Sequence, residues 1–334
     1  MTDTAAIEAR LREAGLIPAG VPTEFRALTG GVASDIWCVE AGETRFAVKR
    51  ALAKLRVAAD WRAPVSRNAA EADWLRTAAG IVPGCVPRIL FHDPDAGLFA
   101  MDFLAPDTHP VWKAELRDGR VDEGFAAKVG ARLGAIHAAT AYDDTIAARF
   151  AHDANFHALR LEPYLEAMAP KYPDLASKLF ALSRDTLARH VALVHGDVSP
   201  KNILAGPDGP IFLDAECAWY GDPAFDLAFC LNHLLLKCIW NPAAAQAYLR
   251  AFDALYTTYF GSVGPRLARG LEARVARLLP GLLLARIDGK SPVEYIVAAA
   301  DKDRVRSIAI PMIEAAPASL TALRDQWRNG LGRN

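Results

Sequence analysis

Polar and apolar positions follow two different rhythms along this chain. In the first hundred residues, short alternating or apolar runs such as residues 44–49 and 97–104 predict β-strands. Farther along, apolar residues recur every three or four positions, which predicts a long buried helix over residues 122–140. Helical patterns continue over residues 223–237, residues 242–260 and most of residues 263–334.

The change from strands to helices predicts an α+β fold with two lobes. It falls near residues 104–107, so we expect a β-rich N-terminal lobe over residues 1–104 and a mainly helical C-terminal lobe over residues 105–334. A chain of 334 residues is long enough for about two domains. Residues 52–65 form a long connection before a helix that we expect to begin near Ser66, and this connection is either a mobile lid or a surface insertion.

The composition is that of an ordinary globular protein, with 52% apolar and 23% charged residues. A net charge of −1 gives no reason to expect nucleic acid or a membrane surface as a partner. The first residues have neither a basic start nor an apolar core, and no apolar run approaches the ~20 residues of a membrane helix, so we expect a cytoplasmic protein. The five cysteines show no Cys-x-x-Cys spacing, which favours reduced thiols.

The strongest chemical motif is His195-Gly196-Asp197 with Asn202 five positions after the aspartate and Asp214 farther on. In the catalytic loop of kinases, an Asp receives the proton of the attacking hydroxyl, an Asn five positions later binds Mg²⁺, and a second Asp binds metal after the next strand. Asp197 is therefore the candidate catalytic base. The alternative is a simple turn at His195-Gly196-Asp197 and a strand cap at Asp214.

The metal ligands predicted from this motif are Asn202 and Asp214, with Glu216 as a further candidate, directly or through water. Mg²⁺ prefers oxygen ligands and is usually held by one or two protein carboxylates and by substrate phosphates. Residues 203–205 and 211–213 read as short strands around a Gly- and Pro-rich turn, so a hairpin would bring Asn202 and Asp214 together.

Phosphate-binding candidates lie in the N-terminal lobe. Gly30 and Gly31, followed by Ser34, form a polar turn whose backbone can approach phosphate closely, although a plain hairpin turn explains the glycines equally well. Lys49 ends an alternating strand, and Glu71 lies one turn inside the helix after Ser66. We expect Lys49 to hold phosphate and Glu71 to pair with it, with Asp73 as the second choice and solvated surface charges as the alternative.

Further candidates lie at the expected hinge and around the catalytic loop. The backbone of Met101 and Phe103 is expected to bind adenine where the strands end. Lys201 either reaches the transferred phosphoryl group or is a solvated loop residue. Asp226, near the start of a predicted helix, is expected to brace the catalytic loop.

Together these motifs resemble the aminoglycoside phosphotransferase, choline kinase and methylthioribose kinase superfamily of small-molecule kinases over roughly residues 29–286. The resemblance implies a protein-kinase-like fold, ATP or GTP as the phosphoryl donor, Mg²⁺, and a small-molecule hydroxyl acceptor. It also implies that Asp197 is the base, that Asn202 and Asp214 bind metal, that Lys49 and Glu71 position phosphate, and that Asp226 holds the catalytic loop, where we also give His195 a supporting role.

Within this superfamily, residues 214–221 are similar to the Asp-Pro-Glu-x-Ala-x-x-Gly segment of methylthioribose kinases. Arg286 is similar to one of their two substrate-contacting arginines, and we expect Trp219 and Arg286 to contact the acceptor. Two differences are a single arginine in place of a pair and Asn202 in place of the usual serine.

The nature of the acceptor is left open by these motifs. Residues 216–334 hold 14 Lys and Arg against 11 Asp and Glu, which favours a neutral or anionic acceptor, such as a sugar-like alcohol, over a polycationic aminoglycoside. A non-catalytic nucleotide-binding protein of the same fold is an alternative, disfavoured by the complete set of Asp197, Asn202 and Asp214. A protein kinase is disfavoured because Asp214 does not begin an Asp-Phe-Gly motif.

Overall fold

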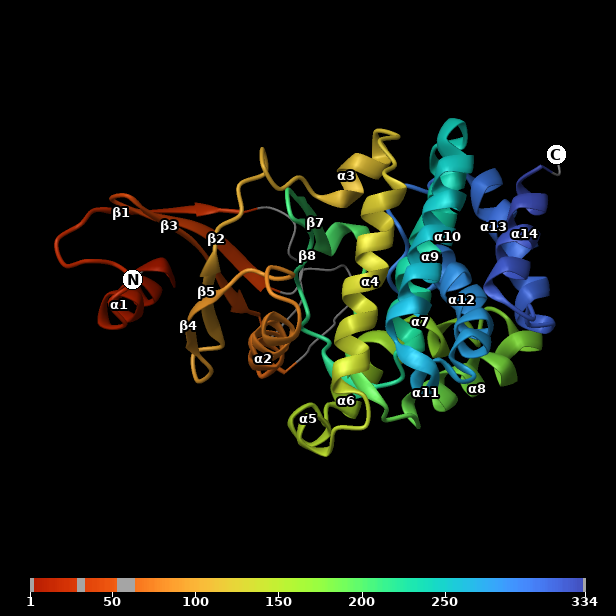
Figure 1. Ribbon diagram of the computed structural model, residues 1–334, viewed down its shortest axis with the longest axis horizontal. Coiled ribbons are helices and arrows are strands. Elements are labelled where there is room, and N and C mark those ends of the chain that lie inside the picture. Colours follow the sequence, from red (N-terminus) through yellow and green to blue (C-terminus); the bar gives the residue numbers. More distant parts are fainter. Residues whose placement is uncertain (1–2, 29–33, 53–63, 333–334) are drawn as a thin grey trace.

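The computed structural model describes residues 3–28, 34–52 and 64–332. A small part built around a β-sheet lies beside a larger part built from helices (Figure 1). The predicted α+β fold is confirmed. The division at residues 104 and 105 stays a prediction, and most of the connection for which we considered a lid, residues 53–63, lies outside the described residues.

The sheet of the small part is antiparallel, with the strand order β1-β2-β3-β5-β4. Residues 44–49 lie in the central strand, as the alternating pattern predicts, and Lys49 is opposite Ile36 on one neighbouring strand and Phe99 on the other. Helix α1 precedes β1 in the chain, and helix α2 lies between β3 and β4. The bounds are α1 Asp3–Glu13, β1 Thr23–Ala27, β2 Ser34–Ala41, β3 Thr44–Ala51, α2 Arg67–Ile81, β4 Ile89–Asp93 and β5 Leu98–Asp102.

Two hydrophobic clusters stabilise the molecule. The smaller one joins α1 to the sheet through residues such as Leu11, Phe46 and Val48. The larger one fills the helical part, and Trp74 and Leu75 of α2 belong to it. Helix α2 also contacts β3, β4 and β5 of the sheet, so it packs against both parts, which fixes Glu71 in relation to the catalytic loop.

The helical part is organised around α9, whose residues from Ala224 to Ile239 are all buried. A helix that is apolar on all sides belongs in the centre of a domain, and α10 and α12 pack against it. The principal helices are α3 Trp112–Arg117, α4 Glu123–Thr140, α5 Asp144–Arg149, α6 Asp153–Phe156, α7 Glu162–Tyr164, α8 Ala176–Leu187, α9 Ala224–Trp240, α10 Ala245–Ser262, α11 Gly264–Ala268, α12 Leu271–Asp288, α13 Ala299–Glu314 and α14 Leu320–Leu331.

Two short two-stranded sheets follow farther along the chain. Strands β7 (Ile203–Gly206) and β8 (Gly209–Phe212) pair as predicted from the turn residues, and β6 (Ala192–Val194) pairs with β9 (Trp219–Gly221). A single turn of helix, η4 (Pro200–Asn202), leads into β7. Strands β7 and β8 lie near the boundary between the two parts (Figure 1), and Asn202 and Asp214 of the predicted catalytic motif flank them in the chain.

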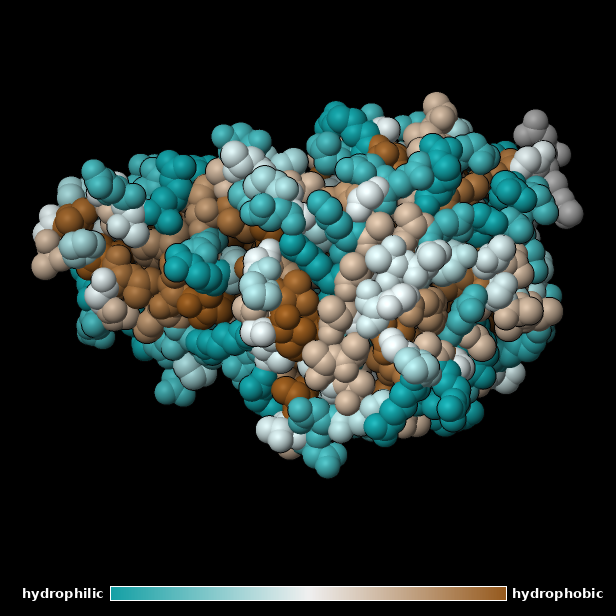
Figure 2. All heavy atoms as spheres, in the orientation of Figure 1, coloured by the Kyte–Doolittle hydropathy of each residue, from teal (hydrophilic) through white to brown (hydrophobic). Residues whose placement is uncertain are grey.

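Among the described residues, no helix is both long and apolar enough to cross a bilayer. Hydrophobic residues gather over the sheet on the face drawn in Figure 2, whereas polar, neutral and hydrophobic residues are mixed over the helical part. All five cysteines are buried and unpaired, so the expectation of free thiols is confirmed.

Candidate active site

Asp226, in the first turn of α9, holds the catalytic loop through hydrogen bonds to its backbone. One carboxylate oxygen accepts the N–H of His195 at 2.7 Å, and the other accepts the N–H of Gly196 at 2.8 Å. His137 lies 3.2 Å from the same carboxylate and 2.8 Å from the hydroxyl of Tyr259. All of Asp226 is buried, so this network fixes the backbone just before Asp197.

His195 has a structural position in the loop. Its Nδ1 accepts the N–H of Asp197 at 3.1 Å, so Nε2 carries the proton and donates to the carbonyl of Leu213 at 3.1 Å. Burial lowers the pKa of His195, although the charge of Asp226 opposes this effect. The neutral ring thus ties Asp197 to the residue that precedes Asp214.

Two left-handed residues shape this region. Gly196 has φ +80°, and a Cβ there would lie 2.6 Å from the carbonyl oxygen of Cys217, so only glycine fits. Asp214 has φ +67°, which is strained for a residue other than glycine. Strain of this kind persists where the surrounding structure holds a functional side chain in place.

Asp197 lies between two cations. Its Oδ2 is 3.0 Å from Nη2 of Arg160 and 3.3 Å from Nζ of Lys201. The charge of Asp197 raises the pKa of Lys201, which therefore stays protonated. Arg160 is buried and also donates to the carbonyl of Gly196. Sequence reasoning missed Arg160, which lies in the π-helix η1 (His157–Leu161) and has no local motif.

Lys49 pairs with Glu71, as the sequence predicted, and also with Asp214, which the sequence did not predict. Its Nζ is 2.7 Å from a carboxylate oxygen of Glu71 and also forms an ion pair with Asp214. Burial alone would lower the pKa of Lys49, but Asp214 and Glu71 raise it above its usual value. Burial opposes the ionisation of Asp214, yet the charges of Lys49 and Lys201 hold its pKa well below normal. An ammonium group shared in this way can exchange one carboxylate for phosphate oxygens.

The oxygens available to Mg²⁺ come from Asp214 and Asn202. The side-chain N–H of Asn202 donates to the carbonyl of Asp197 at 3.1 Å, which leaves the amide oxygen for another partner. Glu216, by contrast, is held 3.0 Å from Arg67 on α2. No group of three or more His, Cys, Asp or Glu within the described chain could form a metal cage. One carboxylate and one amide completed by phosphate oxygens is the kind of site that Mg²⁺ accepts.

The nucleotide-binding predictions are only partly within the described structure. Gly30 and Gly31 lie outside the described residues. Ser34 is buried at the start of β2. Met101 pairs with Ala47 in the sheet, and Phe103 follows the end of β5, so both lie where the small part leads into the helical one.

The predicted acceptor residue Trp219 lies in the hydrophobic core. It is fully buried, its ring stacks on Phe156 with 4.2 Å between centroids, and its indole N–H donates to Asp153. The prediction that Trp219 contacts the acceptor is therefore wrong for this structure, because β9 turns the side chain inward.

Arg286 instead lines a pocket next to the catalytic loop, which we call the cationic pocket. It is defined by Lys113, Pro200, Lys201, His233, Lys237, Arg286, Glu294 and Tyr295. Sequence reasoning found Lys201 and Arg286 and missed the others. One signal was present, since Lys237 is the single charged residue within the apolar run 234–239.

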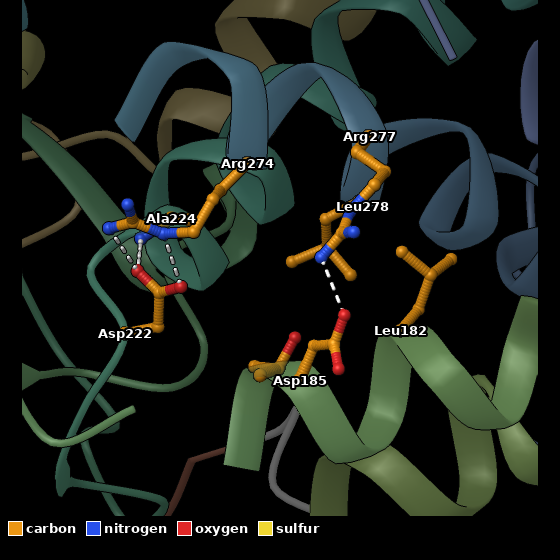
Figure 3. A pocket seen from close by; sticks show the side chains of 8 residues that line it. Leu182, Asp185, Asp222, Ala224, Arg274, Arg277 and Leu278 are labelled. Atoms are coloured by element: carbon orange, nitrogen blue, oxygen red, sulfur yellow. Dashed lines mark hydrogen bonds and ion pairs between the residues drawn. The ribbon is translucent and has the colours of Figure 1, made fainter. Parts of the chain in front are cut away.

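A second pocket lies between α8 and α12, away from these residues (Figure 3). There Arg274 makes two bonds to Asp222, at 2.8 and 3.0 Å, and Arg277 makes one to Asp185 at 2.8 Å. Asp222 also accepts the N–H of Ala224 at 3.0 Å, at the beginning of α9. The charged side chains of this pocket are therefore paired with one another, and Asp222 fixes the start of α9.

The chain was compared with known protein families and curated proteins. A model described as the phosphotransferase enzyme family matches residues 24–262. The methylthioribose kinase of Pectobacterium atrosepticum is 27% identical over 227 residues, which are 59% of this chain and 56% of that protein. The methylthioribose kinase of Geobacillus thermodenitrificans is 26% identical over 303 residues, covering 80% of this chain and 74% of the relative. The chain thus spans little more than half the length of the first of these relatives.

Solved structures share the fold at low sequence identity. A choline/ethanolamine kinase family protein from Mesorhizobium loti has a TM-score of 0.54 and 17% identity, covering 97% of this chain and 99% of that one. An amicoumacin kinase in complex with AMP-PNP, Ca²⁺ and its ligand has a TM-score of 0.56 and 13% identity, with the same coverage of each chain. These similarities confirm the predicted kinase-like fold.

Proposed function

Because this chain belongs to the phosphotransferase enzyme family, we propose that it transfers the γ-phosphoryl group of ATP, or of GTP, to a hydroxyl of a small-molecule acceptor. Residues 1–104 form the nucleotide-binding lobe in this proposal, and residues 105–334 carry the catalytic loop and the acceptor site. The observation that carries the proposal is the convergence of Asp197, Asn202, Asp214, Lys49 and Glu71 at the boundary of the two parts.

The base in this mechanism is Asp197. It accepts the proton of the acceptor hydroxyl while the acceptor oxygen bonds to the γ-phosphorus and the bond from that phosphorus to the bridging oxygen breaks, releasing the nucleoside diphosphate. Arg160 and Lys201 fix the carboxylate, 3.0 and 3.3 Å away. Lys201 is half exposed and can also turn toward the transferred group.

Phosphate positioning falls to Lys49, which Asp214 and Glu71 keep protonated and which Glu71 holds in place. Asn202 and Asp214 would hold Mg²⁺, and the ion supplies charge neutralisation for the phosphate oxygens when bound. The peptide groups near Met101 and Phe103 lie where adenine binds in this proposal. Positioning and electrostatics account for most of the rate, because phosphoryl transfer needs little covalent help from the protein.

A sugar-like alcohol is the acceptor favoured by the relatives, two of which are named methylthioribose kinase. The test is Mg²⁺-dependent transfer from ATP and from GTP to a panel of methylthioribose, other sugars, small hydroxy acids, amino alcohols and aminoglycosides. We expect turnover of at least one acceptor class and its loss in Asp197→Asn. Nucleotide that neither binds nor protects the protein from thermal unfolding would contradict the proposal.

A further inference from the structure

The cationic pocket holds more positive charge than its partners neutralise. Lys201 pairs with Asp197, and Lys113 pairs with Glu294. Lys237 and Arg286 have no carboxylate partner within the described chain, and both are at least nine-tenths buried. Charging a buried lysine or arginine without an anion is costly, so an anionic ligand beside Lys237 and Arg286 would favour their charged forms and be bound by them.

Lys237 is the clearest case. The residue is fully buried in α9, and its Nζ has no hydrogen-bond partner among the described residues. The ammonium lies 4.4 Å from the ring centroid of Trp240 and 4.5 Å from that of Tyr295, and these two rings stack on each other. The rings stabilise the charge from one side and leave its three N–H donors unused.

Two more nitrogens in this pocket lack partners. Nε2 of His233 and Nε of Arg286 are both buried without a hydrogen bond. His233 Nδ1 lies 3.3 Å from the hydroxyl of Tyr295, and Arg286 Nη1 donates to the hydroxyl of Tyr164 at 3.1 Å and to Ser291. Three unused nitrogens from α9 and α12 therefore belong to one pocket.

The pocket adjoins the proposed base. Lys201 lines it and also lies 3.3 Å from Asp197. On the other side, the ring of Tyr164 is 5.6 Å from the guanidinium of Arg286 and 5.9 Å from that of Arg160, the second partner of Asp197. A group in this pocket would thus belong to a molecule whose hydroxyl can reach Asp197.

The size of the cavity limits what it admits. Its volume is about 20 Å³, enough for a group about as large as a water molecule. That suits the end of a planar carboxylate better than a tetrahedral phosphate or a sugar ring. The rest of the acceptor would lie outside, over the catalytic loop.

We propose that the cationic pocket binds a carboxylate of the acceptor, so that the substrate is a small hydroxy acid held by Lys237, Arg286 and His233. This inference rests on the proposed kinase function and gives its acceptor a charge. The alternative ligand for this pocket is a quaternary ammonium or amine packed against Trp240 and Tyr295. The surrounding Lys113, Lys201, Lys237 and Arg286 would repel such a cation.

The experiment compares matched acceptors in which only the charge differs. Hydroxy acids of three to five carbons are tested beside their primary amides and beside amino alcohols of the same length, first for binding by calorimetry and then for phosphoryl transfer from ATP. The proteins are the wild type, Lys237→Met, and Lys178→Met, which makes the same change at an exposed lysine of α8. We expect acids to bind at least tenfold more tightly than amides to the wild type and to Lys178→Met. Lys237→Met is expected to lose this preference, with a higher KM for the acid and an unchanged KM for ATP.

The possible outcomes separate the two proposals. Preferential binding of acids that Lys237→Met abolishes supports the carboxylate site even where no phosphate is transferred, and it then leaves only the kinase function in doubt. Transfer to amides or amino alcohols as readily as to acids overturns the carboxylate site and leaves the kinase function standing. Equal binding of acids and amides to the wild type overturns it as well, whatever the state of the variant.

Discussion

Two pockets of this molecule are lined by basic side chains and differ in how the charges are balanced. In the pocket between α8 and α12, Arg274 and Arg277 each meet an aspartate (Figure 3). In the cationic pocket, Lys237 and Arg286 meet none within the described residues. Both cavities are small, about 10 and about 20 Å³, so volume does not distinguish them.

The difference teaches where to look for function. A buried ion pair whose hydrogen bonds are satisfied needs no ligand. The pair of Asp222 and Arg274 has a structural role, because Asp222 also bonds to the start of α9. Unpaired buried cations lower stability, and such a cost is typical of sites that await a partner. Changes at the paired pocket should therefore affect folding, and changes around the cationic pocket should affect catalysis and binding.

The largest effect is expected for Asp197→Asn, beside the cationic pocket. Loss of the base should lower kcat by about 10²- to 10⁴-fold, whereas the affinity for nucleotide, measured by calorimetry, should change little. Thermal unfolding of the variant provides the control for folding. A variant that keeps its activity would remove Asp197 from the mechanism and, with it, the functional meaning of the neighbouring pocket.

A large effect of a different kind is expected for Asp222→Ala. This substitution leaves the guanidinium of Arg274 without its two bonds and removes the acceptor for the N–H of Ala224. The free energy of unfolding in urea should fall by about 3–5 kcal/mol. Turnover per folded molecule should stay close to that of the wild type, and a selective loss of turnover would break the comparison.

Lys237→Met is expected to stabilise the protein, with a defined pH dependence. Burial and the neighbouring Lys113 lower the pKa of Lys237 to about 7 from its usual 10.5. Between these values the unfolded chain binds the extra proton, so the stability of the wild type rises with pH through this interval. Below pH 7 the cost of the buried cation is complete, and removing it should gain on the order of 1–4 kcal/mol, part of the cost being offset by the two rings.

The gain should shrink as the pH approaches 10.5, which urea unfolding at pH 6, 8 and 10 can measure. Lys178→Met should show no such trend. A destabilised Lys237→Met at pH 6 would mean that its ammonium is compensated in the folded protein. The charged and titratable groups that face the same pocket and also contribute are Lys113, Lys201, His233, Arg286, Glu294 and Tyr295.

The smallest effect is expected for Asp185→Ala, in the paired pocket. Its bond to Arg277 joins two side chains that are 38% and 46% exposed, so solvent screens the interaction. The free energy of unfolding should change by about 0–1 kcal/mol. A loss comparable to that of Asp222→Ala would show that exposure does not separate the two ion pairs.

The sequence predicted the elements that depend on local patterns. Alternation placed Lys49 on a strand, and the Gly- and Pro-rich turn predicted the hairpin between Asn202 and Asp214, because both signals lie within a few residues of the structure they specify. Glu71 was found since it lies one turn inside a recognisable helix. The roles of these residues in catalysis stay predictions.

Contacts between distant segments were beyond such reasoning. Arg67 reaches Glu216 across 149 positions, and Arg160 reaches Asp197 from an irregular helix. Trp219 was misplaced because a three-residue strand does not reveal which face points inward. The cationic pocket combines α3, η4, α9, α12 and the segment after α12, so its charge balance exists only in the folded chain.

The hydrogen bonds that Asp226 accepts from the catalytic loop limit which side chain can occupy position 226. Two adjacent peptide N–H groups point at it, so the side chain must offer two acceptors and no donor. Asparagine has the same shape, but it would turn an NH₂ group toward one of those N–H groups. Glutamate keeps both oxygens but adds a methylene to a fully buried position. The geometry that aims the catalytic loop therefore leaves aspartate without an equivalent substitute at this position.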